Sequence, residues 1–193
     1  MRVIAGSARS LPLKTPAGMG TRPTTDRIKE TLFNMLQPYI GGCVFVDLFS
    51  GSGAIGIEAL SRGAARAYFV ENDRRVIKCI EENLKFTRLS DRARVLPMNA
   101  DSAGEFLQTW EEAVDVIFMD PPYNVELEKQ ALDKLRGCDC VTADTLIVAE
   151  ASLETDFSYL EEFGYMIVKE KRYKTNKHMF IKKRADGAEM RKL

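Results

Sequence analysis

The sequence predicts an α/β protein whose core is a doubly wound, largely parallel sheet. From residue 44 onward, short apolar segments of strand length alternate with longer segments of helical periodicity, and repeated β-α units fold into a parallel sheet with helices on both faces. Near the C-terminus two alternating segments leave no room for a helix between them, which indicates an antiparallel hairpin and a sheet mixed at one edge. The expected strands span residues 44–48, 67–71, 93–98, 114–119, 146–150, 165–172 and 178–183.

The segments between these strands predict helices, and one further helix precedes the sheet. Thr24-Thr25-Asp26 can cap a helix, apolar residues then recur at helical spacing as far as Leu36, and Pro38 is expected to end the pattern. We therefore divide the chain into an N-terminal extension, residues 1–40, which begins with strand fragments and loops, and a main domain, residues 41–193. The expected helices span residues 25–37, 54–61, 74–87, 104–110 and roughly 126–136.

Length and composition favour one ordinary globular domain. The 193 residues are 45% hydrophobic, and a chain of this size needs no disulfide or structural metal to bury a core. Of the four cysteines only Cys138 and Cys140 are close together, so we expect reduced thiols and no metal. The sequence has neither an apolar N-terminal region of signal-peptide length nor a run long enough to span a membrane. We expect a cytoplasmic monomer without a membrane partner.

Charge is unevenly distributed along a chain whose formal net charge is zero. Residues 1–30 carry six Lys/Arg against two Asp/Glu, residues 31–168 carry 12 against 23, and residues 169–193 carry 10 against three. Two basic ends around an acidic middle suggest that the ends hold a polyanion such as nucleic acid. The alternative is that these side chains only solvate terminal segments or protect an edge strand. The candidates for RNA contact are Arg2, Arg9, Lys14, Lys171, Arg172, Lys174 and Lys177.

A glycine-rich loop follows the first expected strand of the sheet. Gly51-Ser52-Gly53-Ala54-Ile55-Gly56 fits G-x-G-x-x-G between a strand and a helix, which is the context that this motif requires. Glycine allows a tight turn and lets a ligand approach the main chain. Glu71 lies 20 residues after Gly51, at the end of the next strand, where a carboxylate can bond a ribose diol. Together these residues indicate an adenosine-type cofactor; a glycine turn with chance caps is the alternative.

The acidic residue before the loop indicates which adenosine cofactor is bound. Asp47 would repel a pyrophosphate, whereas S-adenosylmethionine has no phosphate and carries a sulfonium and an ammonium. Asp101, after the third strand, is well placed to bond an adenine amine. We therefore expect S-adenosylmethionine rather than NAD, and we place Phe49 and Asn72, which adjoin these positions, in the same site.

The four residues Asp120-Pro121-Pro122-Tyr123 follow the fourth strand, at the edge of the sheet where ligands bind. A base amine is a poor nucleophile because its lone pair delocalises into the ring. Asp120 and a backbone carbonyl of the Pro121-Pro122 segment can each accept an N–H bond, which frees that lone pair toward a methyl group. The prolines stiffen the loop, and Tyr123 can stack on the base. The alternative is a proline-stiffened turn in which the aspartate caps a helix.

These motifs resemble those of class I methyltransferases, and more narrowly the RsmD family of bacterial ribosomal RNA guanine-N2 methyltransferases. The similarity covers nearly the whole chain, and the combination with the Arg22-Pro23-Thr24 segment is more specific than the DPPY motif, which adenine and cytosine N-methylases share. The segments that carry the resemblance are Arg2-Val3-Ile4-Ala5-Gly6, residues 20–27, Phe33-Asn34-Met35-Leu36, Asp47-Leu48-Phe49-Ser50-Gly51-Ser52-Gly53, Phe69-Val70-Glu71 and Asp120-Pro121-Pro122-Tyr123.

The resemblance implies a Rossmann-like, seven-stranded sheet that ends in the hairpin. It implies methylation of a guanine of small-subunit (16S) ribosomal RNA on N2, with Asp120 and Tyr123 holding the guanine. Gly51, Gly53, Glu71 and Asp101 would contact the cofactor, and Arg22 and Thr24 would lie near the cofactor or the target base.

Three functions remain open at this point. The first is a ribosomal RNA guanine-N2 methyltransferase, for which both naked RNA and an assembling small subunit are open as substrates. The second is a DNA adenine-N6 or cytosine-N4 methylase, although the chain has no room for a separate target-recognition domain. The third is a cofactor-binding RNA chaperone with a silent site. The single histidine, His178, lacks an accompanying Ser or Cys pattern and is expected to be structural, and Trp110 is expected in the core or on a helix surface.

Overall fold

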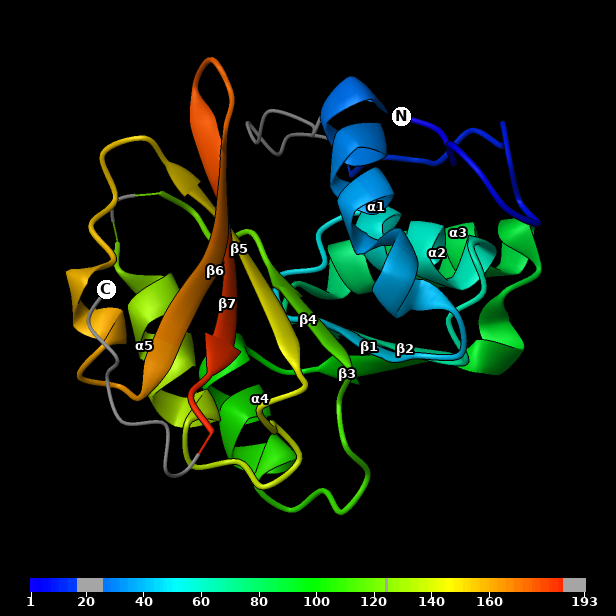
Figure 1. The fold of residues 1–193 in the computed structure, drawn as a ribbon. Helices are drawn as coiled ribbons and strands as arrows, with labels where there is room; N and C mark the ends of the chain where they lie inside the picture. Colours follow the sequence, from blue (N-terminus) through cyan, green and yellow to red (C-terminus); the bar gives the residue numbers. More distant parts are fainter. Residues whose placement is uncertain (17–25, 124, 186–193) are drawn as a thin grey trace.

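The computed structural model describes residues 1–16, 26–123 and 125–185. Its centre is a seven-stranded sheet in the order β3-β2-β1-β4-β5-β7-β6, drawn in Figure 1. The first five of these strands are parallel, whereas β7 is antiparallel to both β5 and β6. The elements are α1 (Asp26–Ile40), β1 (Val44–Asp47), α2 (Ala54–Ser61), β2 (Arg66–Glu71), α3 (Arg74–Thr87), β3 (Ala93–Pro97), α4 (Ala100–Leu107), β4 (Val116–Met119), α5 (Leu127–Leu135), β5 (Leu146–Ser152), β6 (Tyr165–Arg172) and β7 (Asn176–Lys183).

Helices cover both faces of the sheet, with α1, α2 and α3 on one side and α4 and α5 on the other (Figure 1). Successive strand residues point to opposite faces, so Phe45 packs with the first group of helices while Val44 and Val46 pack with the second. The central strands β1 and β4 are buried along their whole length, as expected when helices lie on both faces. The predicted Rossmann-like α/β fold with a mixed, seven-stranded sheet and a terminal hairpin is confirmed.

Two predicted helices have different bounds in the structure. The helix α1 continues through Pro38 to Ile40, and the buried Ile40 side chain packs into the core, which favours the last turn despite the proline. The helix α4 spans Ala100–Leu107 rather than residues 104–110, because the side chain of Asn99 accepts a hydrogen bond from Ser102 N at 2.8 Å and caps the helix there. Trp110 follows the helix and packs edge-on against Tyr68, with ring centroids 4.4 Å apart.

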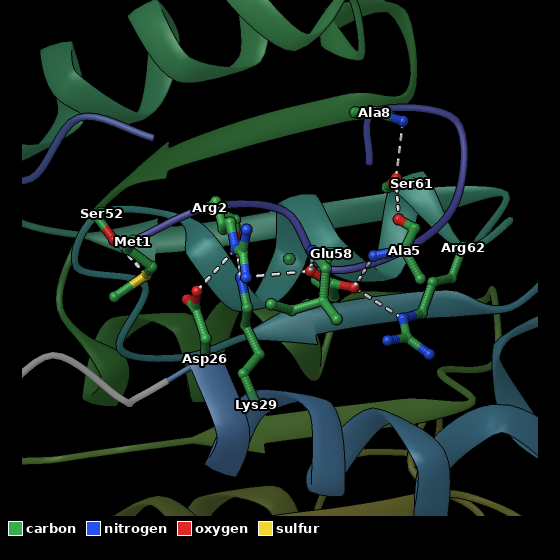
Figure 2. Close-up of polar contacts among 12 residues, drawn as sticks. Met1, Arg2, Ala5, Ala8, Asp26, Lys29, Ser52, Glu58, Ser61 and Arg62 are labelled. Carbon is green, nitrogen blue, oxygen red and sulfur yellow. Dashed lines mark hydrogen bonds and ion pairs between the residues drawn. The ribbon is translucent and has the colours of Figure 1, made fainter. Parts of the chain in front are cut away.

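The N-terminal segment, residues 1–16, is held on α1 and α2 by a buried ionic cluster (Figure 2). Glu58 of α2 accepts hydrogen bonds from the backbone N–H groups of Ile4 and Ala5 at 2.8 and 3.0 Å. The same carboxylate forms ion pairs with Lys29 Nζ at 3.3 Å and Arg62 Nε at 2.8 Å. Both Lys29 and Glu58 have fully buried side chains. One carboxylate therefore joins the N-terminal segment, α1 and the helix that follows the glycine loop.

Candidate active site

A cleft of about 1030 Å³ opens at the carboxyl ends of the parallel strands. It lies where the chain reverses its direction of winding, between β1 and β4, and such switch points bind ligands in open α/β sheets. Gly53 is not among the lining residues, and Arg22 and Thr24 lie outside the described residues. The sequence-predicted residues that line the cleft are Asp47, Phe49, Gly51, Glu71, Asn72, Asp101, Asp120, Pro121, Pro122 and Tyr123.

The glycine loop has the geometry that its sequence predicts. Gly51 and Gly53 have φ of +50° and +77°, a region that residues with a Cβ rarely adopt. A Cβ at Gly51 would meet nothing within 4 Å, so the main chain there is open to a ligand. A Cβ at Gly56 would collide with the ring of Phe69, and this glycine therefore allows α2 to pack closely on β2.

Backbone donors hold the carboxylate of Glu71 at the end of β2. Its Oε1 accepts hydrogen bonds from Asn72 N at 2.8 Å and Asp73 N at 3.0 Å, and its Oε2 accepts from Gly51 N at 3.2 Å. A carboxylate has about four acceptor positions. The backbone occupies three of these, so one remains for a ligand hydroxyl rather than the two that a ribose diol would need for separate bonds.

Asp47, at the end of β1, is a buried carboxylate that lacks one partner. Its Oδ2 accepts a hydrogen bond from Gly56 N at 3.3 Å, whereas no donor among the described residues reaches its Oδ1. Burial, together with the nearby charge of Glu71, raises the pKa of Asp47 to about 7. A buried acceptor without a donor is costly, so a cationic N–H group in the cleft would fit this position.

Asp120 follows β4 and faces the same cleft. No hydrogen-bond donor from the described part of the chain reaches its carboxylate, which lines the cleft. Burial, and then the charges of Glu150 and Asp47, raise the pKa of Asp120 well above its usual value. Tyr123 is 40% exposed, and its hydroxyl donates to Glu150 Oε1 at 3.1 Å.

Glu150 is a cleft residue that the sequence analysis did not single out. In the β4–β5 pairing Met119 lies opposite Ala149, so Glu150, within β5, and Asp120, just after β4, occupy the next positions along adjacent parallel strands. The sequence did contain a signal for Glu150, because this acidic residue follows the apolar run of residues 146–149 as Asp120 follows the run of residues 116–119. His178, expected to be structural, is buried behind Glu150, with Nε2 3.0 Å from Glu150 Oε2.

The N-terminal segment forms part of the wall of the cleft, because Met1, Thr15 and Pro16 line it. Asn83 of α3 fixes this segment beside the glycine loop. Its Nδ2 donates to Ser52 O at 3.0 Å and to Lys14 O at 3.0 Å, and its Oδ1 accepts from Lys14 N at 2.9 Å. The role of Asn83 was not predicted from the sequence, because its two partners, Ser52 and Lys14, lie far from it along the chain.

The C-terminal hairpin turns at the same edge of the sheet as the cleft. Ser152, at the carboxyl end of β5, pairs with Asn176, so residues 173–175 lie beyond that edge. Lys174 and Arg172 are exposed there, and Lys171 is half-buried. Arg2, Arg9 and Lys14 lie on the N-terminal segment, where Arg2 pairs with Asp26 at 3.0 Å and Lys14 pairs with Glu82 at 2.7 Å.

The prediction that Lys177 contacts RNA is wrong. Its side chain is buried, and its ammonium donates to the backbone carbonyls of Leu153 and Thr155 at 3.2 and 2.7 Å. A lysine that already satisfies buried carbonyls is not available to a phosphate. The alternating sequence pattern of β7 could not show that Lys177 is buried, because the carbonyl groups that it contacts belong to the loop after β5.

The described ranges, residues 1–16, 26–123 and 125–185, contain neither a membrane-spanning helix nor a metal-binding cluster. None of their helices is both long and apolar enough to cross a lipid bilayer. Within the same ranges, no group of three or more His, Cys, Asp or Glu side chains is arranged to hold a metal ion.

Comparison with known proteins places the chain in a family. The family model described as "Conserved hypothetical protein 95" matches residues 1–182. Ribosomal RNA small subunit methyltransferase D of Escherichia coli is 40% identical over 80% of this chain and 76% of its own length. The Haemophilus influenzae protein of the same name is 37% identical over 89% of this chain and 88% of its own length. The solved structure of Escherichia coli yhhF is 33% identical, covers 96% of this chain and 99% of its own, and has a TM-score of 0.80. The chain therefore belongs to the RsmD family of methyltransferases.

Proposed function

We propose that this methyltransferase transfers a methyl group from S-adenosylmethionine to the exocyclic N2 of a guanine in small-subunit (16S) ribosomal RNA. The observation that carries the proposal is the presence, in one cleft, of a buried carboxylate oxygen without a donor on Asp47 and an open carboxylate on Asp120. The first suits a cationic cofactor and the second suits an amine. The names of the Escherichia coli and Haemophilus influenzae relatives support the choice of small-subunit ribosomal RNA.

The residues around the glycine loop fit S-adenosylmethionine. Asp47 Oδ1 would accept an N–H bond from the ammonium of the cofactor, and Glu71 would accept one from a ribose hydroxyl. Asp101, which is exposed and 3.7 Å from Lys134 Nζ, would accept from the adenine amine. The cofactor supplies an electrophilic methyl group on its sulfonium. The proposed cofactor set is Asp47, Phe49, Gly51, Gly53, Glu71, Asn72 and Asp101, together with Arg22 and Thr24.

Cofactor affinity should weaken as pH falls through 7. The pKa of Asp47 is raised to about 7, so acid neutralises the carboxylate that would hold the ammonium. We expect the dissociation constant of S-adenosylhomocysteine, which keeps the ammonium, to be about tenfold higher at pH 6 than at pH 8, as follows from titrating one essential group. Calorimetric titration at several pH values measures this.

The Asp47→Asn variant tests this carboxylate through two quantities, the affinity for the cofactor and the free energy of unfolding. It should bind the cofactor more weakly at pH 8 and show a flat pH profile, whereas the control Asp101→Asn should keep the slope. Because the folded pKa of Asp47 lies above its unfolded value, ionisation destabilises the free fold as pH rises from about 4 to 7. The free energy of unfolding of Asp47→Asn should therefore exceed that of the wild type at pH 8. A wild-type affinity independent of pH would contradict the role of Asp47.

At the other end of the cleft, Asp120 would accept one N–H bond from the target amine. A backbone carbonyl of the Pro121-Pro122 segment would accept the other, which turns the nitrogen lone pair toward the methyl group. Tyr123 would stack on the base, a contact typically worth about 1–3 kcal/mol. A base within folded RNA must leave its stack to enter this cleft. Positioning the amine in line with the sulfonium would supply much of the rate.

The basic hairpin tip and the N-terminal segment would hold the RNA backbone. The proposed contacts are Lys171, Arg172 and Lys174 at the tip, and Arg2, Arg9 and Lys14 in the extension, residues 1–40. We propose that this extension acts as an accessory to the methyltransferase domain, residues 41–193.

The double variant Lys171→Ala/Lys174→Ala should bind RNA more weakly and with less dependence on salt. Each lost phosphate contact lowers the slope of log affinity against log salt by about one, so we expect a decrease of about two. Titration of labelled small-subunit RNA at several salt concentrations measures the slope. The control is Lys85→Ala, an exposed residue in the last turn of α3, away from the cleft edge. An unchanged slope in the double variant would mean that the hairpin is only a solvated edge.

Transfer of labelled methyl groups to alternative substrates tests the proposed function. The protein is incubated with labelled S-adenosylmethionine and immature small ribosomal subunits, naked 16S RNA or DNA. We expect label in the RNA, with assembling particles as the better substrate. Label in DNA would favour a DNA adenine or cytosine methylase. If the protein is folded and binds the cofactor but labels no substrate, a cofactor-binding RNA chaperone with an inactive site would be favoured.

A further inference from the structure

The buried acid Glu150 lies near the carboxyl end of β5, beside the proposed target-amine residue Asp120. Their strands are paired in register, and adjacent strands lie about 4.8 Å apart. Glu150 is 5% exposed, yet it lines the cleft. Neither the proposed cofactor contacts nor the proposed contact with the target amine uses this carboxylate.

Three donors hold Glu150 in one orientation. Tyr123 Oη and Asn176 Nδ2 donate to its Oε1 at 3.1 and 2.5 Å. On the other oxygen, His178 Nε2 lies 3.0 Å from Oε2, and Tyr173 Oη lies 3.3 Å from His178 Nδ1. If the Tyr173 hydroxyl donates to Nδ1, the imidazole proton lies on Nε2 and donates to Glu150. This arrangement satisfies each group and keeps Glu150 an acceptor.

The donors leave about one acceptor position of Glu150 free. A carboxylate has about four positions, and three are occupied. Glu150 lines the cleft beside Asp120, so a base bound in the cleft could reach the free position. The cleft would then present two carboxylates side by side, one for the amine and one for the atom next to it on the base edge.

That neighbouring atom differs between the bases. Beside its exocyclic amine, guanine carries an N1–H donor. Adenine carries the N1 acceptor beside N6, and cytosine carries the N3 acceptor beside N4. A fixed carboxylate accepts from guanine N1–H and repels the lone pair of adenine N1 or cytosine N3. Asp120 alone cannot make this distinction, because all three bases offer an amine.

We propose that Glu150 selects guanine by accepting a hydrogen bond from its N1–H, while Asp120 accepts from its N2 amine. The inference rests on the proposed function and gives it a specificity-determining residue. Tyr173, Asn176 and His178 are positioning residues that keep Glu150 oriented and able to accept.

The test replaces the target guanine by 2-aminopurine, which keeps the 2-amine but has an acceptor at N1 and a hydrogen in place of O6. The comparison with Glu150→Gln separates the N1 contribution from any effect of losing O6. Small-subunit RNA is assembled with guanine or 2-aminopurine at the nucleotide to which the methyl label maps, and kcat/KM is measured for both. The wild type should favour guanine by roughly 10- to 100-fold, as expected for losing a hydrogen bond to a charged group. In Glu150→Gln the amide can donate to the N1 acceptor, so the ratio should fall to about one or invert. The control Glu154→Gln, an exposed acid after the same strand, should keep the wild-type ratio.

Three outcomes would overturn the inference. A wild type that methylates both RNAs equally would overturn the role of Glu150 without any variant, so misfolding of Glu150→Gln cannot protect the inference. An unchanged ratio in a folded Glu150→Gln protein would also overturn it and leave Glu150 as a support for Tyr123 and His178. A wild type that binds cofactor but does not methylate the guanine RNA would overturn the proposed function and this inference together.

Discussion

Replacing Asp120 with alanine should abolish most methyl transfer while leaving cofactor affinity within a few-fold of the wild type. Asp120 carries an open carboxylate at the end of β4, where the target amine would lie. Removing a preorganised hydrogen-bonding group that acts in the transition state lowers kcat by about 10²- to 10³-fold. The proposed cofactor contacts come from other strands, through Asp47 at the end of β1 and Glu71 at the end of β2, and the substitution removes neither carboxylate.

Two measurements separate these effects. Single-turnover transfer from labelled S-adenosylmethionine to RNA reports the chemical step, and calorimetric titration with S-adenosylhomocysteine reports the cofactor. The Asp144→Ala variant is the matched control, because Asp144 is an exposed acid before β5, away from the cleft. If Asp120→Ala lost activity and cofactor affinity in equal measure, Asp120 would belong to the cofactor site and not to the amine site.

Replacing Glu58 with alanine should lower the free energy of unfolding by about 3–5 kcal/mol, the range seen when one partner of a buried ion pair is removed. Glu58 is fully buried, and it pairs with the equally buried Lys29. Burial lowers the pKa of Lys29, whereas the charge of Glu58 raises it. Without Glu58 the lysine would remain buried without its counter-charge, and Ile4 N and Ala5 N would lose their acceptor (Figure 2).

Urea unfolding of the wild type, Glu58→Ala and Glu112→Ala measures this difference. Glu112 pairs with Arg66 at 3.0 Å on the surface, and such exposed pairs contribute about 0–1 kcal/mol. The double variant Glu58→Leu/Lys29→Met should recover much of the loss, since apolar residues can replace a buried ion pair. Equal small losses in both single variants would contradict the view that Glu58 holds the N-terminal segment.

Local signals predicted most of the fold. The bounds of α2 and α3 match the expected residues 54–61 and 74–87, because the glycine loop and the Asp73 cap lie next to the helices they start. The continuation of α1 past Pro38 could not be predicted, since it depends on burial of Ile40 against distant strands. The early start of α4 was marked by Asn99, whose capping side chain could have been recognised from the sequence.

The candidate site likewise contains residues that local motifs predicted and residues that only the tertiary structure identifies. Asp47, Glu71 and Asp120 were found because each follows a strand next to a recognisable motif, and all three line the cleft. Glu150 depends on the pairing of β4 with β5. The buried state of Lys177 depends on the carbonyl groups of a loop more than 20 residues away. Such contacts require the tertiary structure.

The most direct measurement is the chemical identity of the methylated base. Small subunits labelled by the wild-type protein are stripped of protein, their 16S RNA is digested to nucleosides, and the labelled nucleoside is identified by mass spectrometry against standards. We predict that the label is in N2-methylguanosine in the wild-type reaction and accumulates about 10²- to 10³-fold more slowly with Asp120→Ala. Label in N6-methyladenosine, N4-methylcytidine or a ribose methyl group would contradict methylation of guanine N2 in this cleft.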